Sequence, residues 1–130
     1  MSKPRVSLVI AGEPAPKGSR TVGTRKDGSH YTRESSPGVK SWVEAVAYSA
    51  RANQPGGRAL EPPYEIDLAF SLRRPADPSW DWPSTCDVDK LCRGVLDGLV
   101  QGGLLVDDRH VVKLSASKRY GTPCVAVTVL

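Results

Sequence analysis

The sequence predicts a small α+β domain in which a mixed β-sheet is packed by two main helices. Two segments repeat apolar residues at helical spacing, and four segments alternate apolar and polar residues as strands do. The length of 130 residues fits one domain with one core, so we expect residues 1–130 to fold as a single unit.

The chain begins with a predicted strand and continues into a predicted loop. Residues 5–11 alternate the apolar Val6, Leu8 and Ile10 with intervening side chains, which is the strand period. Residues 12–37 are rich in Gly, Pro, Ser, Lys and Arg and show little apolar periodicity. We expect this segment to be a mobile basic loop, and long loops in small domains are usually functional.

A helix is predicted over residues 38–53. Trp42, Val46 and Ala50 follow one another at intervals of four and define one buried face. The Gln-Pro-Gly-Gly sequence at residues 54–57 ends the helix.

The middle of the chain predicts a strand followed by a loop. Residues 64–72 alternate Ile66, Leu68 and Phe70 with other side chains, as a strand does. Residues 73–85 contain several prolines and two tryptophans, a composition typical of a loop.

The last part of the chain predicts a second helix and two more strands. Residues 87–101 carry an apolar arc at helical spacing and stop at the glycines 102–103. Residues 111–120 and 124–130 are strand-like, and the Gly-Thr-Pro sequence at 121–123 predicts a hairpin turn between them.

Charge and composition narrow the class of partner. The net charge is +4, and residues 1–40 alone carry eight basic and three acidic residues, a net charge of +5. This favours a polyanionic partner, and nucleic acid is the first candidate. Three cysteines without a CxxC pair argue against a disulfide framework and a zinc ribbon. The apolar runs are too short for a membrane span or a secretory signal, so we expect a cytoplasmic protein without a membrane partner.

Aspartates form the most informative group of side chains. They are Asp87, Asp89, Asp97, Asp107 and Asp108. An Asp at a helix start is an ordinary cap, and the i, i+4, i+8 spacing of Asp89, Arg93 and Asp97 also fits an exposed ion-pair ladder. The adjacent Asp107 and Asp108, however, repel each other and need water, basic partners or a cation. Hard divalent ions bind carboxylate oxygens, so these acids would suit Mg²⁺, or Mn²⁺ in its place.

The spacing of these aspartates leaves their arrangement open. The helix over residues 87–101 is about 21 Å long, whereas the return through residues 104–106 covers only about 10 Å. Asp107 therefore reaches the start of the helix only if the helix packs obliquely or if the carboxylates belong to the other subunit of a dimer.

The spacing of these residues resembles the RusA family of Holliday-junction endonucleases. The family pattern is D-x-D-N, a basic residue, D-A-L, a Gly and D-D-x-x-V. The matching positions here are Asp87-Val88-Asp89-Lys90, Arg93, Asp97-Gly98-Leu99, Gly103 and Asp107-Asp108-Arg109-His110-Val111. The earlier stretch from Pro14 to Arg20 resembles the P-x-P-K-G-R-P-R segment of the family more loosely, with Ser19 in place of an Arg.

The resemblance implies a homodimeric, Mg²⁺-dependent endonuclease that acts on branched DNA, above all the four-way junction. By position, it implies that the metal ligands are Asp87, Asp89, Asp107 and Asp108. Arg93 joins Asp87, Asp89 and Asp108 as a catalytic residue, and Asp97 and Lys90 support them. Lys90 stands where Asn is common in the family, and Arg93 stands where Lys is common. An Arg can clamp a phosphate with two hydrogen bonds but cannot donate a proton as a Lys can.

Basic and aromatic side chains complete the predicted DNA surface. The predicted phosphate contacts in the basic loop are Lys17, Arg20, Arg25, Lys26 and Arg33. Further candidates are Arg73, Arg74, Lys113, Lys118 and Arg119. Trp80 and Trp82 are expected to anchor their loop against the core, and stacking on unpaired junction bases is the alternative.

Two other functions remain open at this level. A basic DNA-binding protein without catalysis would use the same aspartates as caps and ion pairs, and it would not cut DNA when Mg²⁺ is added. An endonuclease acting mainly on flaps or replication forks would share the chemistry of a junction resolvase and differ in its preferred DNA.

Overall fold

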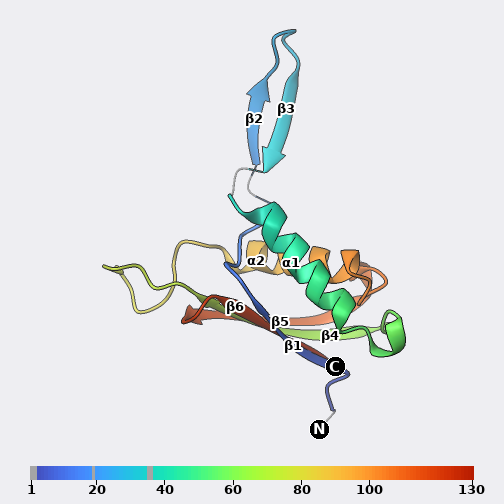
Figure 1. The fold of residues 1–130 in the computed structure, drawn as a ribbon. Helices are drawn as coiled ribbons and strands as arrows, with labels where there is room; N and C mark the ends of the chain where they lie inside the picture. The colour runs from blue at the N-terminus through green and yellow to red at the C-terminus, as the bar shows by residue number, and fades with distance from the viewer. Residues whose placement is uncertain (1–2, 19, 35–36) are drawn as a thin grey trace.

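The computed structural model describes residues 3–18, 20–34 and 37–130 (Figure 1). Four strands form the main sheet in the order β1-β6-β4-β5, and two helices cover one face of it. The elements of this body are β1 (Val6–Ala11), α1 (Val39–Ala52), β4 (Tyr64–Leu72), α2 (Val88–Gln101), β5 (Val111–Tyr120) and β6 (Cys124–Val129). The predicted α+β class with two main helices is confirmed.

The sheet is mixed because one of its three pairings is parallel. β6 pairs antiparallel with β1 and with β4, whereas β4 and β5 run parallel. Parallel neighbours need a crossover, and α2 supplies it between β4 and β5. β5 lies at the edge of the sheet, with no strand paired to its outer side among the described residues.

One apolar core lies between the helices and the sheet. Phe70 and Leu68 of β4 are fully buried under Val46 of α1 and Leu91 and Val95 of α2. These are the positions that the apolar periodicities predict, because a strand exposes alternate residues to one face and a helix buries one stripe.

Buried Tyr64 fixes the end of the crossover to the sheet. Its hydroxyl donates a hydrogen bond to the Leu60 carbonyl at 2.7 Å and accepts one from the Val106 N–H at 3.0 Å. The Val106 backbone is therefore held at the start of β4, and the position of the two aspartates that follow is set by this contact.

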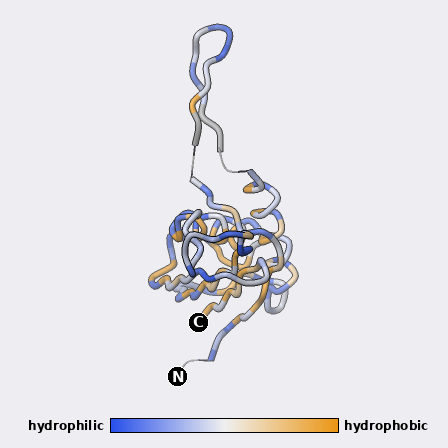
Figure 2. The backbone as a smooth tube through the Cα atoms, turned by 90° about the vertical axis from the view of Figure 1, so that its left-hand side faces the viewer, coloured by the Kyte–Doolittle hydropathy of each residue, from blue (hydrophilic) through white to orange (hydrophobic). Residues whose placement is uncertain are grey.

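Residues 12–37 are not a continuous loop, so that prediction is wrong over much of the segment. β2 (Arg20–Thr24) and β3 (His30–Glu34) pair as an antiparallel hairpin that projects from the body (Figures 1 and 2). At its turn the Asp27 carboxylate accepts hydrogen bonds from the Ser29 N–H and hydroxyl, at 2.9 and 2.6 Å, and these bonds lower the pKa of Asp27. Gly28, with φ +89°, supplies the left-handed residue that the turn needs.

The predicted hairpin turn at residues 121–123 is also wrong. β5 and β6 are consecutive in sequence, but β4 lies between them in the sheet. The connection passes over the end of β4, where the Gly121 N–H donates to the Leu72 carbonyl at 3.0 Å.

No helix in the described ranges is both long and apolar enough to cross a membrane.

Glycines on α2 let it lie directly against α1. A Cβ built at Gly98 would stand 2.5 Å from Cγ1 of Val46, and one built at Gly102 would stand 2.2 Å from the Ala47 carbonyl oxygen. Both distances are impossible for real atoms, so the close approach of the two helices depends on these glycines. At Gly94 the nearest atom is at an ordinary 3.5 Å.

We expect Gly98→Ala to lower the free energy of unfolding by roughly 1–3 kcal/mol, because the added methyl overpacks the seam between the helices. Gly94→Ala is the matched control. It has room for the methyl and should stabilise the protein by up to about 1 kcal/mol through helix propensity. Urea unfolding of the wild type and both variants at one protein concentration measures these effects. Equal stabilities of the two variants would contradict the packing argument.

Candidate functional site

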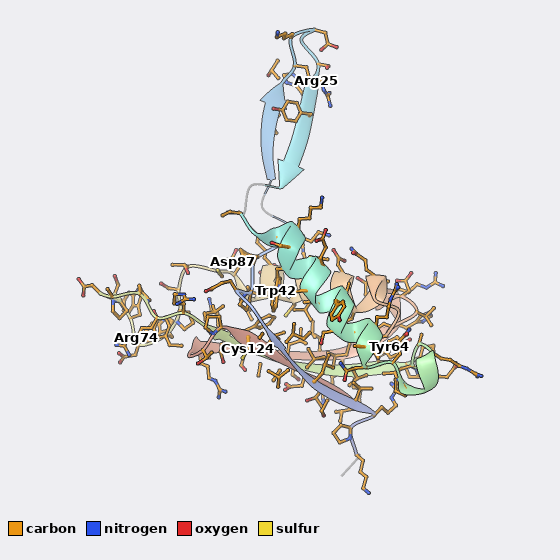
Figure 3. The ribbon with its side chains drawn as sticks, viewed as in Figure 1. Arg25, Trp42, Tyr64, Arg74, Asp87 and Cys124 are labelled. Carbon is orange, nitrogen blue, oxygen red and sulfur yellow. The ribbon has the colours of Figure 1, made fainter. Side chains whose placement is uncertain are left out.

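The first group of acids lies at the start of α2. Asp87 is the N-cap residue by backbone, but its side chain makes no capping hydrogen bond, and its Oδ2 lies 3.6 Å from Nζ of Lys90. Asp89 is exposed in the first turn, where a carboxylate interacts favourably with the helix dipole. Burial raises the pKa of the nearby Cys92 thiol, and the charge of Asp89 raises it further. Asp87 is labelled in Figure 3, at the start of α2.

The second group of acids lies at the other end of the crossover. Asp107 precedes a short 3₁₀ turn, Asp108–His110, and its carboxylate accepts a hydrogen bond from the Arg109 N–H at 3.0 Å. This bond is the largest cause that lowers the pKa of Asp107. The pKa of Asp108 is raised by burial, by a hydrogen bond with Asp107, and by the charges of Asp107 and Asp97. Three carboxylates therefore influence one another here, an environment typical of functional sites.

Lys17 provides the counter-charge for this second group. Its ammonium forms an ion pair with Asp97, and both side chains are about two-thirds buried, at 30% and 32% exposure. The Lys17 N–H also donates to the Lys90 carbonyl at 3.0 Å, so the chain leading to the hairpin runs along α2. Lys17 thus lies at the acidic group and not on the projecting arm, and its pairing with Asp97 was not predicted.

A pocket of about 410 Å³ gathers these charges. It is lined by Lys17, Gly18, Arg93, Leu96, Asp97 and Asp108. At Gly18, with φ +113°, an added Cβ would stand 2.7 Å from Nη1 of Arg93, so a larger residue there would be strained and would displace this guanidinium. No ion pair joins Arg93 to Asp89 or Asp97 among the described side chains, so the alternative interpretation of their spacing as an ion-pair ladder is not observed. An Arg beside carboxylates in an open pocket can bind a phosphate oxygen pair.

The two acidic groups are separate within one chain. Asp89 and Asp97 are eight residues apart on α2, which corresponds to about 12 Å along the helix axis. Over the described ranges, no three His, Cys, Asp or Glu side chains are placed to hold one metal ion. Within one chain the charges of Asp97 and Asp107 both act on Asp108, whereas Asp87 and Asp89 lie at the other end of α2.

The hairpin carries part of the predicted basic arm. The Arg25 guanidinium lies 5.1 Å above the ring centroid of Tyr31, and Lys26 is exposed at the turn. Figure 2 shows that this tip is hydrophilic. Arg20 and Arg33 belong to β2 and β3 by backbone, but their side chains lie outside the described part of the structure, as does Ser19.

The other predicted DNA contacts divide into anchored and exposed side chains. Nε of Arg73 donates to the Glu13 carboxylate at 2.9 Å, and the Lys118 ammonium donates to the Cys86 carbonyl. Arg74 lies 5.6 Å above the ring centroid of Tyr120. Lys113 and Arg119 are exposed on β5.

Trp80 and Trp82 do not anchor their loop, so that expectation is wrong. They are 53% and 55% exposed, and their rings stack on each other with centroids 5.0 Å apart and planes 21° apart.

Comparison with known proteins identifies the family. The family model of endodeoxyribonuclease RusA matches residues 11–130, which is nearly the whole chain. No relative is found among curated proteins. The match includes both acidic groups, Lys17 and strands β4, β5 and β6 of the main sheet, whereas all of β1 except its last residue, Ala11, precedes it. The predicted resemblance is confirmed, and this chain belongs to the RusA family of endodeoxyribonucleases.

Proposed function

We propose that this protein is a homodimeric, Mg²⁺-dependent endonuclease that resolves four-way (Holliday) DNA junctions by hydrolysing phosphodiester bonds. The observation that carries the proposal is the presence of two clusters of aspartates, one at each end of α2. Lys17 and Arg93 lie beside the second cluster. Membership of a nuclease family supports the same chemistry. A four-way junction has two-fold symmetry and needs paired cuts, which a homodimer can supply.

The donor set fits a hard divalent cation in its chemistry. The candidate ligands Asp87, Asp89, Asp107 and Asp108 offer only carboxylate oxygens, which Mg²⁺ and Mn²⁺ prefer. When bound, such an ion activates water and stabilises charge on a phosphate. One chain alone does not bring these ligands to one point, because no three of its described acids form a metal-binding group.

A second chain paired along β5 would unite the two groups. The start of α2 lies at the C-terminal end of β5, where Lys118 holds the Cys86 carbonyl, whereas Asp107 and Asp108 directly precede the strand. Antiparallel pairing of two β5 edges about a two-fold axis would place Asp108 of each chain near the start of the partner's α2, where the partner's Asp87 and Asp89 lie. The open outer edge of β5 supports this arrangement, because an unpaired strand edge is a ready template for strand addition.

The cationic side chains have distinct roles in this proposal. Arg93 holds the phosphate oxygens by a bidentate contact that its planar guanidinium favours. Lys17 orients Asp97 through their ion pair. Its ammonium also lines the pocket that holds Arg93, and it can donate a proton there, which an arginine cannot do. Lys90 lies beside the first acidic group, where its ammonium pairs with the Asp87 carboxylate.

The purified protein should cut a labelled four-way junction in Mg²⁺ and not in EDTA, and cut duplex DNA much less. Asp89→Asn should reduce cleavage by more than about a hundredfold while junction binding persists, because the amide keeps the shape but loses a charged ligand. Cleavage gels and mobility shifts on the same DNAs measure both effects.

The same assay separates the alternative functions. Junction binding without cleavage in Mg²⁺ or Mn²⁺ would identify a non-catalytic DNA-binding protein. Faster cutting of flaps or model replication forks than of junctions would make those DNAs the substrate. Full activity of Asp89→Asn would remove this residue from the site.

A mixing experiment tests whether the site spans two chains. Asp89→Asn and Asp108→Asn should each be inactive alone. In a refolded 1:1 mixture about half of the dimers are mixed, and each mixed dimer would contain one site with both residues intact. Nicking of a supercoiled cruciform plasmid should then return to roughly a quarter of the wild-type level, since one site in two works in half of the dimers.

A matched control is a mixture of Asp87→Asn with Asp89→Asn, two residues that the same chain contributes to one site. Every site in its mixed dimers carries one substitution, so this mixture should stay inactive. Native mass spectrometry establishes that mixed dimers have formed in both mixtures. An inactive Asp89/Asp108 mixture that contains mixed dimers would place all the acids of one site on one chain.

The hairpin tip should contribute phosphate contacts. Replacing Arg25 and Lys26 by alanine should flatten the plot of log K against log salt by roughly 0.9 for each phosphate that is no longer neutralised. Alanine at Arg51 and Arg58, two exposed cations on the body, is the control and should leave the slope unchanged. Fluorescence anisotropy of a labelled junction at several salt concentrations gives the slopes. An unchanged slope in the Arg25/Lys26 variant would exclude the tip from the DNA footprint.

A further inference from the structure

Residues 73–85 form an irregular loop that presents an unusual aromatic surface. Trp80 and Trp82 stack on each other and leave more than half of each side chain exposed. Large apolar side chains usually lose their contact with water on folding, so two stacked tryptophans kept outside the core are a candidate binding surface. Figure 1 shows this loop extending away from the sheet between β4 and α2.

The loop is held at both ends, which gives the tryptophan pair a fixed base. At its start Arg73 binds Glu13, which follows β1. At its end the Lys118 ammonium binds the Cys86 carbonyl, one residue before the first of the acids. Pro83 directly follows the pair and is buried. A stacked pair on such a loop is pre-organised, so a flat ligand can stack on its outer face at a low entropic cost.

The charges around the pair suit a nucleic acid. Within the loop Asp77 and Asp81 balance Arg73 and Arg74, so the loop itself has no net charge. The end of β5 adds the exposed Arg119, and Arg74 lies over the Tyr120 ring as a further cation on an aromatic face. Exposed aromatic rings and arginines in the same part of a surface are features that bind unpaired bases together with their phosphates.

We propose that Trp80 and Trp82 form a stacking platform for unpaired DNA bases beside the scissile strand. This inference rests on the proposed function, because the branch point of a junction is where bases lose their stacking partners. The platform precedes Asp87 by only five residues, so a base stacked on Trp82 would orient the strand that enters the site. It would also favour branched DNA over duplex, whose bases offer no free face.

The test uses binding alone, in EDTA, with three probes. They are a four-way junction with 2-aminopurine at the branch point, a single-stranded oligo-dT, and a fully paired duplex. The variant Trp80→Ala/Trp82→Ala should bind the first two probes roughly 5- to 150-fold more weakly, the range expected for the loss of one base stack, and bind duplex as the wild type does. Wild-type protein should quench the 2-aminopurine, and the variant should not.

Two controls separate stacking from general damage. Trp80→Phe/Trp82→Phe keeps an aromatic face and should retain most of the affinity and quenching. Tyr48→Ala removes another exposed aromatic side chain, 80% exposed on α1, and should change nothing. Circular dichroism and the elution volume of each variant establish that fold and oligomeric state are preserved.

Several results would overturn the inference. Unchanged binding to junction and oligo-dT, or an equal loss on duplex, would exclude a base platform. A change of oligomeric state in the Trp80→Ala/Trp82→Ala variant would make the pair a protein interface instead. Cleavage is assayed separately in Mg²⁺. A wild type that never cuts, together with a tryptophan variant that no longer binds oligo-dT, would refute the endonuclease proposal and support the platform.

Discussion

β4 and β5 run parallel, and parallel neighbours cannot be joined by a tight turn. The chain must leave one end of β4, cross the face of the sheet and enter β5 from the opposite end. α2 is that crossing, so its first and last residues are separated by the length of the helix. The aspartates before and after α2 are therefore kept apart by topology and not by local side-chain choice. The described residues of one chain accordingly form no metal-binding group that joins the two sets of aspartates.

The seam between α1 and α2 determines which flank of α2 remains available for chemistry. Gly98 and Gly102 bring the backbones of the two helices into contact, and the apolar arc of α2 faces the sheet. Only the remaining flank can carry Arg93 and Asp97 toward solvent. The segment containing Lys17 and Gly18 then closes over this flank and pairs with Asp97. The core and the pocket thus depend on the same orientation of one helix.

The sequence predicted the body of the fold because its apolar residues recur at the periods of helices and strands. β4 and β5 were predicted with the bounds that the structure has, and α1 and α2 to within one residue at each end. The hairpin of β2 and β3 was not predicted, because Val22 is its only aliphatic strand residue. The Asp27-Gly28 sequence favours a turn, but the residues on either side of it do not alternate between apolar and polar side chains as strands usually do. The position of β4 between β5 and β6 was missed because a short Gly-Pro connection resembles a hairpin turn.

The acids of the candidate site could be found from their spacing, and the length of the helix between them left two arrangements open. The sequence could not decide between these arrangements, because the separation within one chain follows from strand direction, which no local pattern encodes. The ion pair of Lys17 with Asp97 joins residues 80 positions apart, so it too is a property of the fold. The exposure of Trp80 and Trp82 was wrongly predicted because tryptophan usually packs inside, and proline-rich loops give no periodicity by which to tell the two cases apart.

The environment of Cys92 has a consequence for oxidative damage. This thiol sits on the helix that carries the first acids, yet burial and the charge of Asp89 both raise its pKa. Oxidants and alkylating agents attack the thiolate, whose population falls as the pKa rises. Burial, with the charge of Asp89 adding to its effect, thus favours the thiol form of Cys92 over the reactive thiolate.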